Sequence, residues 1–317
     1  MKAAVEAAAR FGYRQHMNML APDSGQAEAG LLRPARSSPQ PVIIAASHCW
    51  RGRAAAAVQD LRESLRLWPL VWTLSLFDIR LRYRGSLLGP FWLTLSTAVM
   101  IGAIGFVYSR LFHQDVAAYL PFLAISLVLW NFINVITAEG ATCFSTSADM
   151  IRAQRMAHTV HPARVVVRNL LVLAHNLAVI VVVFLIYPSH LTWSVLSEVP
   201  ALALWVLDAF AAALLLGMVG ARYRDVPPIV ASIMQIAFYI TPIMWSPAML
   251  VHRGLGLSVA LIDMNPFFGL LQIVRGPLLG LPVDVSAWIN ALCASAVLVV
   301  AAFLLFVRAR PRIPYWV

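Results

Sequence analysis

Long apolar stretches alternate with short polar gaps along most of the chain, and the gaps differ from one another in charge. A helix needs about 20 consecutive apolar residues to cross the hydrocarbon core of a bilayer. Six stretches come near this length: residues 87–112, 119–137, 165–187, 200–220, 227–245 and 286–307. The pattern therefore predicts an all-α integral membrane protein with six transmembrane helices.

The arginines divide the gaps into two kinds. Fourteen of them lie just before the first stretch, between the second and third, between the fourth and fifth, or after the sixth. The alternate gaps hold only Arg110, Arg253 and Arg275. Because cytoplasmic loops of membrane proteins retain Arg and Lys, the alternation predicts that both termini are cytoplasmic.

Composition agrees with the membrane class and excludes several others. Hydrophobic residues make up 61% of the chain and charged residues 12%, and the mean hydropathy is +0.77. Soluble domains lie nearer about 45–50% and about 25%. The net charge is +10, but the arginines flank the spans and form no single basic face, so nucleic acid is not an expected partner. The three cysteines are scattered, so we expect no metal site.

The N-terminal residues 1–57 differ from the rest of the chain. They are rich in Ala, Arg, Pro and Ser, and they lack both a spanning stretch and the pattern of a signal peptide. We expect a disordered tail or an upstream extension here, and a membrane domain over residues 58–317.

The segment between this tail and the first span is amphipathic. Apolar residues recur at helical spacing from Leu70 to Leu81, and Pro69 suits the first turn of a helix. Asp78 and several arginines make the segment too polar to cross. It is typical of an interfacial helix on the inner membrane surface; a soluble core helix is the alternative, but no soluble domain is available to pack on it.

Two of the longer gaps predict short helices. Between spans two and three, Met150 and Ile151 face one side of a helix while Arg152 and Arg155 face another, which indicates a helix that docks on a partner or, alternatively, a solvated linker. Between spans five and six, apolar pieces at 249–261 and 267–279 are too short to cross. We interpret them as re-entrant or interfacial outer helices; the alternative is a plain outer loop.

The second outer piece has further marks of a gate. Asn265-Pro266 separates it from the first piece, and it carries Arg275 before Gly276-Pro277. Asn265, Pro266 and Arg275 are therefore the candidate gate residues.

The chain offers little catalytic chemistry. A nucleotide-binding P-loop needs a lysine, and Lys2 stands far from any Gly-rich turn, so we expect no ATPase site, no cofactor and no enzyme activity here. Glu139, His175 and Asp208 are ionisable residues in or near spans, which are costly there. Helix–helix hydrogen bonds or a wet cavity explain them better than a proton relay does, because they are scattered.

Five motifs carry a resemblance to a known family. They are Arg82-Tyr83-Arg84-Gly85-Ser86-Leu87-Leu88-Gly89-Pro90-Phe91-Trp92; Arg222-Tyr223-Arg224-Asp225-Val226-Pro227; Thr241-Pro242-Ile243-Met244-Trp245; Asn265-Pro266 with Ile273-Val274-Arg275-Gly276-Pro277-Leu278-Leu279-Gly280; and Arg312-Ile313-Pro314-Tyr315-Trp316-Val317. In this order on a six-span frame, they resemble ABC-2 type permeases of bacterial polysaccharide exporters, and among them the lipopolysaccharide O-antigen export permeases. The chain departs from many such permeases before span three, where it has Val160-His161-Pro162-Ala163-Arg164 and they have a Phe-Pro-Arg-like element.

The resemblance implies a homodimer in the bacterial inner membrane that pairs with two copies of a separate ATPase subunit, which binds ATP. It implies that the helix around Met150, Ile151, Arg152 and Arg155 couples that subunit to the pore. The outer helices then form a gate, and the substrate is a lipid-linked polysaccharide moved from cytoplasm to periplasm.

Aromatic rings on spans one and five are candidates for the channel lining. Sugars can stack their CH faces on rings, but rings at membrane interfaces and in helix packing are the alternative. The rings available are Trp92, Phe106, Tyr108, Phe238, Tyr239 and Trp245. Arg82 and Arg84 could contact an anionic lipid pyrophosphate at the inner face, or could simply anchor the chain there.

Three rival functions stay open from the sequence. An ABC-2 exporter of capsule, teichoic acid or a drug would share the fold. A membrane-embedded glycolipid-modifying transferase would need clustered acid and base residues, which the sequence does not show. Ion-driven transport would need internal repeats and paired intramembrane charges.

Overall fold

The computed structural model describes residues 49–87, 89, 91–111, 115–187, 193–245, 262–282 and 284–317, and these are folded into helices and connecting turns without strands. The α-helices are α2 (Trp50–Arg66), α3 (Trp68–Arg82), α4 (Phe91–Leu111), α5 (Val116–Thr142), α6 (Ala148–Ala153), α7 (Val160–Ile186), α8 (Glu198–Arg222), α9 (Val226–Ile240), α12 (Pro266–Leu278), α13 (Val285–Ala309) and α14 (Ile313–Trp316). Short 3₁₀ turns η1 (Ser145–Ser147), η2 (Trp193–Ser197) and η3 (Arg310–Arg312) precede α6, α8 and α14. The predicted all-α class is confirmed.

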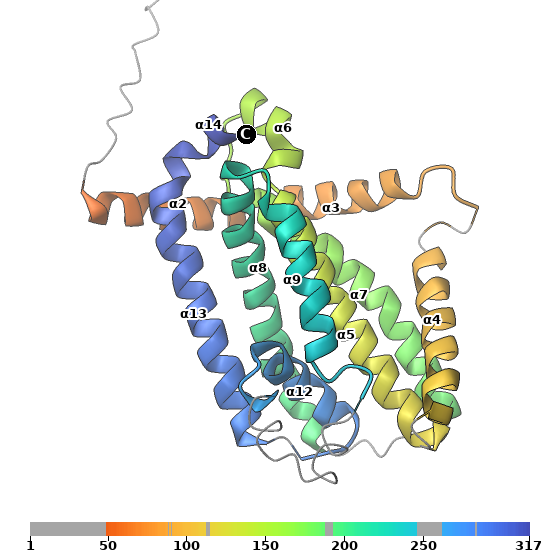
Figure 1. The fold of residues 1–317 in the computed structure, drawn as a ribbon. Helices are drawn as coiled ribbons and strands as arrows, with labels where there is room; N and C mark the ends of the chain where they lie inside the picture. The colour runs from red at the N-terminus through yellow and green to blue at the C-terminus, as the bar shows by residue number, and fades with distance from the viewer. Residues whose placement is uncertain are drawn as a thin grey trace, which may run out of the picture. The chain divides into compact units, whose positions relative to one another are not determined.

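Within the described residues, five helices are long and apolar enough to cross a membrane: α4, α5, α7, α8 and α13. They run side by side as a bundle (Figure 1). The predicted stretch 227–245 is shorter in the structure, because α9 has 15 residues and ends at Ile240. Pro242 lacks the N–H that another helical turn would require, which explains why the helix stops there.

Small residues bring α5 and α8 into close contact. A Cβ atom added to Gly220 would lie 2.0 Å from the carbonyl oxygen of Ala141, and one added to Gly140 would lie 2.7 Å from Cα of Ala213. In lipid, helices gain little from hydrophobic burial, so close backbone packing of this kind holds them together. The pair forms the centre of the bundle.

Helices α2 and α3 run across one end of the bundle (Figure 1). Residues 50–57, which sequence analysis placed in the tail, are helical, because residues 54–57 are four alanines with high helix propensity. Leu67 separates the two helices, and Pro69 lies in the first turn of α3, as predicted. Residues 1–48 lie outside the described residues, so the predicted tail is not tested there.

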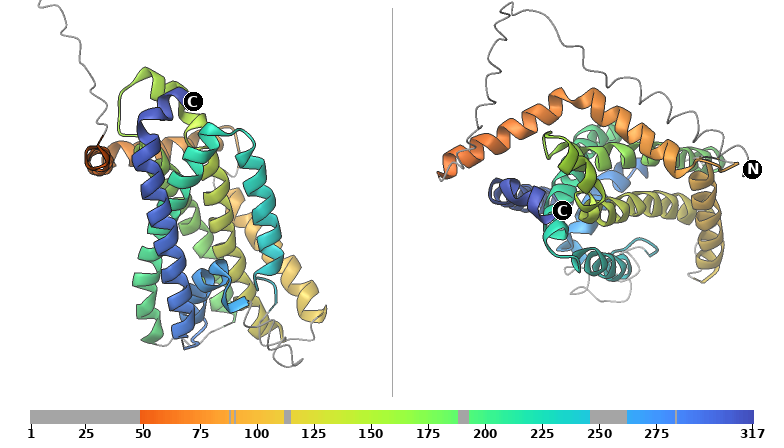
Figure 2. Two further views of the ribbon diagram at one scale, coloured as in Figure 1. Left: turned by 60° about the vertical axis from the view of Figure 1, so that its left-hand side comes forward. Right: turned by 90° about the horizontal axis from the view of Figure 1, so that it is seen from above.

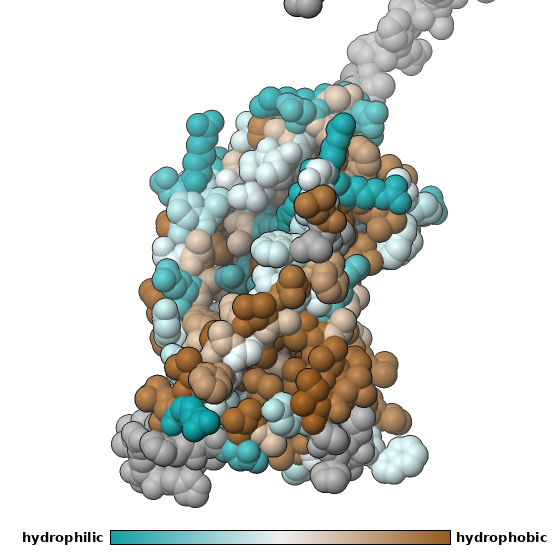
Figure 3. Space-filling model, turned by 90° about the vertical axis from the view of Figure 1, so that its right-hand side faces the viewer, coloured by the Kyte–Doolittle hydropathy of each residue, from teal (hydrophilic) through white to brown (hydrophobic). Residues whose placement is uncertain are grey.

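We call the end that carries α2, α3, α6 and α14 the α6 end, and the opposite end the α12 end; Figure 2 shows both from two further directions. Seen from the side on which α4 lies, hydrophilic residues gather toward the α6 end and hydrophobic residues cover much of the lower half (Figure 3). The predicted outer piece 267–279 corresponds to α12. The piece 249–261 lies outside the described residues.

Candidate functional site

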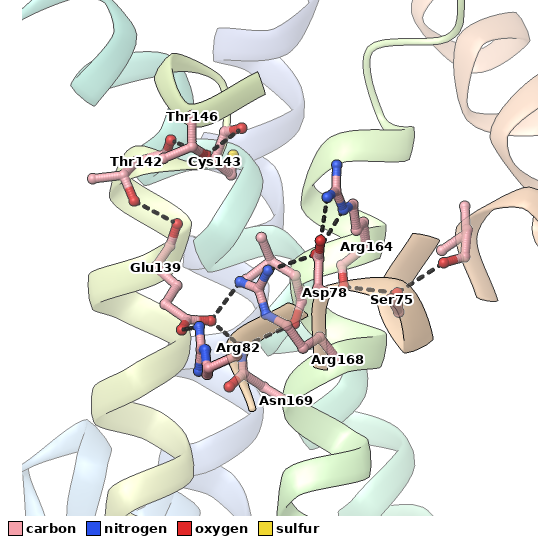
Figure 4. Close-up of polar contacts among 12 residues, drawn as sticks. Ser75, Asp78, Arg82, Glu139, Thr142, Cys143, Thr146, Arg164, Arg168 and Asn169 are labelled. Atoms are coloured by element: carbon pink, nitrogen blue, oxygen red, sulfur yellow. Dashed lines mark hydrogen bonds and ion pairs between the residues drawn. The ribbon is translucent and has the colours of Figure 1, made fainter. Parts of the chain in front are cut away.

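A network of charged side chains joins α3, α5 and α7 at the α6 end (Figure 4). Arg168 of α7 lies at its centre, 2.8 Å from Asp78 of α3 and 2.6 Å from Glu139 of α5. Arg164 donates two bonds to Asp78, and Arg82 of α3 lies 2.6 Å from the other oxygen of Glu139. We call these five residues the charged junction. They clamp a helix that crosses the bundle end to two helices of the bundle.

The electrostatics of the charged junction favour the ionised carboxylates. Burial raises the pKa of Asp78, but the hydrogen bonds and charges of Arg164 and Arg168 lower it by more, so its pKa lies below the ordinary value. Asn169 donates to Glu139 at 2.7 Å and adds a neutral partner. Each carboxylate therefore meets two arginines, as a partly buried carboxylate requires.

A second polar contact lies where α2 meets the beginning of α7. The Asp60 side chain is 1% exposed and accepts hydrogen bonds from the backbone N–H groups of His158 and Thr159 at 3.3 and 3.1 Å. Arg310, after α13, lies 2.8 Å from the same carboxylate. Asp60 thus satisfies free N–H groups at a helix start, and it ties α2 to both α7 and the end of α13.

The residues predicted to couple to an ATPase lie on α6 and just after it. Ile151 is buried and Met150 half-buried, whereas Arg152 and Arg155 are exposed. Arg152 donates to the main-chain oxygen of Val317 at 2.7 Å, so α6 is held against the C-terminal segment. The apolar side of this predicted surface helix therefore faces the protein.

Two motifs that are distant in sequence meet at the same end. The guanidinium carbon of Arg222 lies 5.4 Å from the ring centre of Tyr223 and 5.3 Å from that of Trp316. These distances are within the range of cation–π contacts. The motif after α8 and the motif at the C-terminus therefore form one contact.

At the α12 end, the turn after α9 is held by three side chains from other elements. Asn265 caps α12 by accepting from Phe267 N–H at 3.0 Å, and its amide donates to the Thr241 hydroxyl at 2.9 Å. Tyr119 of α5 donates to the carbonyl of Met244 at 2.6 Å. Pro266 occupies the first turn of α12, as its missing N–H allows.

Arg275 is the third side chain on this turn. It is 2% exposed and donates to the carbonyl of Pro242 at 2.7 Å, to the Ser126 hydroxyl at 3.1 Å and to the Gln272 amide oxygen at 2.7 Å. Its guanidinium also lies 4.5 Å from the ring centre of Phe122. Within the described part of the chain no carboxylate pairs with it. Neutral oxygens and a ring face therefore hold a buried cation that joins α12, α5 and the turn.

The structure does not bring the predicted channel rings into one cluster. On α4, Trp92 and Phe106 are 55% and 65% exposed, while Tyr108 is half-buried. On α9, Phe238 packs on Trp130 of α5 at 5.9 Å between ring centres. The remaining predicted residues are the exposed Tyr239, the half-buried Trp245 and the exposed Arg84. Helices α4 and α9 each pack mainly on α5, and Trp92, Phe106 and Tyr239 are exposed on them.

The ionisable residues of the spans have separate, local roles. Glu139 belongs to the charged junction, and a ring nitrogen of His175 lies 2.9 Å from a carbonyl of its own helix, at Leu171. Asp208 of α8 accepts from Ser295 of α13 at 2.6 Å, which is the helix–helix hydrogen bond expected from the sequence. Among the residues described, no group of His, Cys, Asp and Glu could hold a metal ion.

Sequence reasoning missed Asp60, Asp78 and Arg168 as organising residues. A signal was available, because acidic residues are few at the arginine-rich end, and a carboxylate buried there must take an arginine as its partner. Which arginine it takes depends on tertiary packing and cannot be read from spacing.

Comparison with known proteins supports the resemblance. No family model matches the chain. It is 24% identical over 214 residues, 68% of its length, to the O-antigen export system permease protein RfbA of Myxococcus xanthus, of which it covers 82%. It is 22% identical over 188 residues, 59% of its length, to a protein of the same name from Klebsiella pneumoniae, of which it covers 73%. The resemblance to O-antigen export permeases is confirmed, and the chain is a multi-pass membrane protein.

Proposed function

We propose that this chain is the permease subunit of an ATP-driven ABC exporter. Two copies of it pair with two copies of a separate ATPase subunit in the bacterial inner membrane. Together they move a lipid-linked polysaccharide of the O-antigen type from the cytoplasm to the periplasm. The chain itself supplies the path, and the ATPase subunit binds ATP.

The observation that carries this proposal is the spatial pairing of the motifs behind the resemblance. Arg222 meets Trp316 at the α6 end, and the turn at Thr241 meets Asn265 and Arg275 at the α12 end. Motifs separated by tens of residues are thus assembled into two groups at opposite ends of one bundle. A transporter needs one set of contacts at the end where the ATPase subunit binds and another at the end where the substrate leaves.

The α6 end is the cytoplasmic end in this proposal, and α9 is the fifth of six spans, between α8 and α13. Arginines precede α4, lie at the start of α7, separate α8 from α9 and follow α13, so all of these groups gather at that end. With 15 residues α9 reaches about 22 Å, and the turn after it must complete the crossing. Both termini are then cytoplasmic, and α3 exposes Leu70, Phe77 and Leu81 along the inner membrane surface.

The ATPase subunit binds the surface formed by α6 and the residues that follow it. Arg155 is exposed there, and α6 is braced by Arg152 on the C-terminal segment. A braced helix can transmit a push to the bundle, whereas a free linker cannot.

The second copy packs against α4 and α9, and the two copies enclose the path. Of the 18 consecutive residues that make α4 apolar enough to cross a membrane, only 11% are buried, against 61% for the corresponding residues of α5. Trp92, Phe106 and Tyr239 line the path in this arrangement, with Arg82 and Arg84 at its inner mouth. Helix α12 closes its outer end as a re-entrant gate, held by Arg275.

Reconstitution tests the proposal directly. The full-length chain is placed in vesicles with lipid-linked O-antigen polysaccharide, with and without its ATPase subunit, and polymer that has crossed is measured by its protection from an added glycosidase. We expect transfer only with ATPase and ATP. Transfer by the chain alone would refute the division of labour.

A charge reversal tests the contact surface. Arg155→Glu should lower ATPase co-purification and export together, while Arg80→Glu, an exposed charge on α3, serves as the matched control. Normal complex formation and export by the Arg155→Glu variant would remove α6 as the contact.

A further inference from the structure

An apolar groove of about 470 Å³ lies beneath α2, between α7, α8 and α13. Of its twenty lining residues only Ser64 and Thr159 are polar, and the Thr159 hydroxyl already lies 2.8 Å from a carboxylate oxygen of Asp60. An ordered water needs two to four polar partners. The groove is therefore suited to hydrocarbon and not to water.

The groove extends over about half the thickness of a bilayer. On α8 its lining runs from Ala203 to Leu214, which is about 16 Å at a rise of ~1.5 Å per residue. Along α7 it runs from the cap residue Thr159 to Leu170, over the same distance. Half of the hydrocarbon core measures about 15 Å. The length of the groove thus corresponds to one leaflet, the one at the α6 end.

The width of the groove selects the shape of its occupant. Its volume divided by its length gives a cross-section of about 30 Å². A single extended hydrocarbon chain fits this space, because it is one carbon wide and its carbons contact their neighbours at about 3.5–4.0 Å.

The groove opens sideways, at the level of the membrane. Leu65 and Trp68 on its roof are 66% and 48% exposed, and Leu207 on its wall is 47% exposed. A chain of a bilayer lipid can therefore enter laterally, without leaving its leaflet.

Positive charge stands at the α2 end of the groove. Arg62 and Arg66 directly follow the lining residues Leu61 and Leu65, and both are exposed. Of the two acidic residues on α2, Asp60 is bonded to Arg310, and only Glu63 stays exposed. A basic helix above an apolar groove is complementary to an anionic headgroup above an acyl chain.

We propose that this groove binds one acyl chain of an anionic phospholipid from the leaflet at the α6 end, with the lipid phosphate against Arg62 and Arg66. The identity of that leaflet as cytoplasmic rests on the proposed function; the binding itself does not. A bulk phospholipid is the occupant because it is the hydrocarbon present at the highest concentration around the groove.

The test measures lipids retained by the full-length chain. The protein is reconstituted in bilayers of equal parts phosphatidylglycerol and phosphatidylcholine, released gently and examined by native mass spectrometry. Ala203→Trp fills the groove from an exposed lining position, and Leu202→Trp places the same ring on the neighbouring exposed residue outside it. Arg62→Gln with Arg66→Gln removes the charge and leaves the groove. Elution as a single species before and after mild heating shows that each variant is folded.

The proposal expects wild type and Leu202→Trp to retain phosphatidylglycerol, and Ala203→Trp to retain at least tenfold less. In the double arginine variant, the ratio of retained phosphatidylglycerol to retained phosphatidylcholine should fall roughly thirty-fold, which is the effect of two arginines near an anionic headgroup.

Four results would overturn the proposal. Ala203→Trp could retain as much lipid as wild type, or Leu202→Trp could lose as much lipid as Ala203→Trp. The species that Ala203→Trp loses could be a second copy of the protein and not a lipid. An equimolar polyprenyl phosphate could displace the bound phospholipid. None of these measurements involves ATP or glycan, so the lipid site and the export function fail independently.

Discussion

Arg168 is the residue on which the charged junction depends most. It makes two charged hydrogen bonds, of 2.8 Å to Asp78 and 2.6 Å to Glu139, and its side chain is 14% exposed. Replacing it with Met removes both bonds while each carboxylate keeps its other arginine. A hydrogen bond to a charged group contributes about 1.5–3 kcal/mol, and the remaining partners compensate part of the loss. We expect the free energy of unfolding to fall by about 2–4 kcal/mol.

Arg82 provides the internal comparison. It makes one bond to Glu139, of 2.6 Å, but its side chain is 45% exposed. An exposed ion pair contributes about 0–1 kcal/mol. For a chain of this size, about 1 kcal/mol corresponds to roughly 2–4 °C in the unfolding midpoint. Arg168→Met should therefore lower the midpoint by about 4–16 °C and Arg82→Met by no more than about 4 °C. Arg168→Lys should fall between them, because a lysine cannot span both carboxylates in a fixed fork.

The assay heats the full-length protein in detergent and measures the fraction that still elutes as one species, since membrane proteins commonly unfold irreversibly. A second reading uses pH. Because the folded-state pKa of Asp78 is lowered, its contribution is present above its ordinary pKa of 3.8 and is lost as pH falls through the lower folded value. Without Arg168 the folded-state pKa of Asp78 is lowered less, so its contribution should be smaller and its loss complete at a higher pH. Equal effects of Arg168→Met and Arg82→Met would refute the central role of Arg168.

Further predictions concern packing, Arg275 and pH. Gly220→Val should abolish folded protein, because a Cβ atom there would lie 2.0 Å from a backbone oxygen. Gly102→Ala should be neutral or stabilising, because no atom lies within 4 Å of the added Cβ. Expression levels and size-exclusion profiles check both variants. Arg275→Met should leave buried oxygens unpaired, costing about 1–3 kcal/mol, and should speed proteolysis at the α12 end, with Arg275→Lys milder; an unchanged digestion rate would contradict this. Burial lowers the pKa of His158, so stability is complete above pH 6.5 and declines as pH falls below it; His158→Gln should remove that part of the slope in midpoints measured from pH 7.5 to 5.5.

The bundle could be predicted from sequence because its cause is visible there. Length and hydropathy define α4, α5, α7, α8 and α13, since any helix that crosses lipid must be apolar along its whole length. The end of α9 was placed too late, because Pro242 removes one backbone donor while the stretch around it stays apolar. Helix α2 was missed because four alanines among arginines read as tail composition, although alanine is the best helix former.

The polar contacts could not be predicted, because each one joins segments distant in sequence. Asp78 and Arg164 are 86 residues apart, and Arg275 and Ser126 are 149 apart. The sequence singled out Arg275 as a candidate gate residue, one of three arginines on the arginine-poor side. Its partners turned out to be oxygens of a neighbouring turn and of α5, which no local pattern contains.

Helix α5 connects the charged junction to the turn after α9, and this limits how the protein can move. It carries Glu139 of the charged junction at one end and Tyr119 and Ser126, which hold the turn and Arg275, at the other. At Gly140 of α5 and Gly220 of α8 the two helices are in backbone contact with no side chain between them. Separating them would therefore open voids along both helices. In α4, by contrast, only 11% of the residues in its most apolar stretch are buried. A rearrangement that opens a path therefore costs least if α5 and α8 move as one body and α4, the least buried of the five long spans, shifts on the surface of α5 and α7.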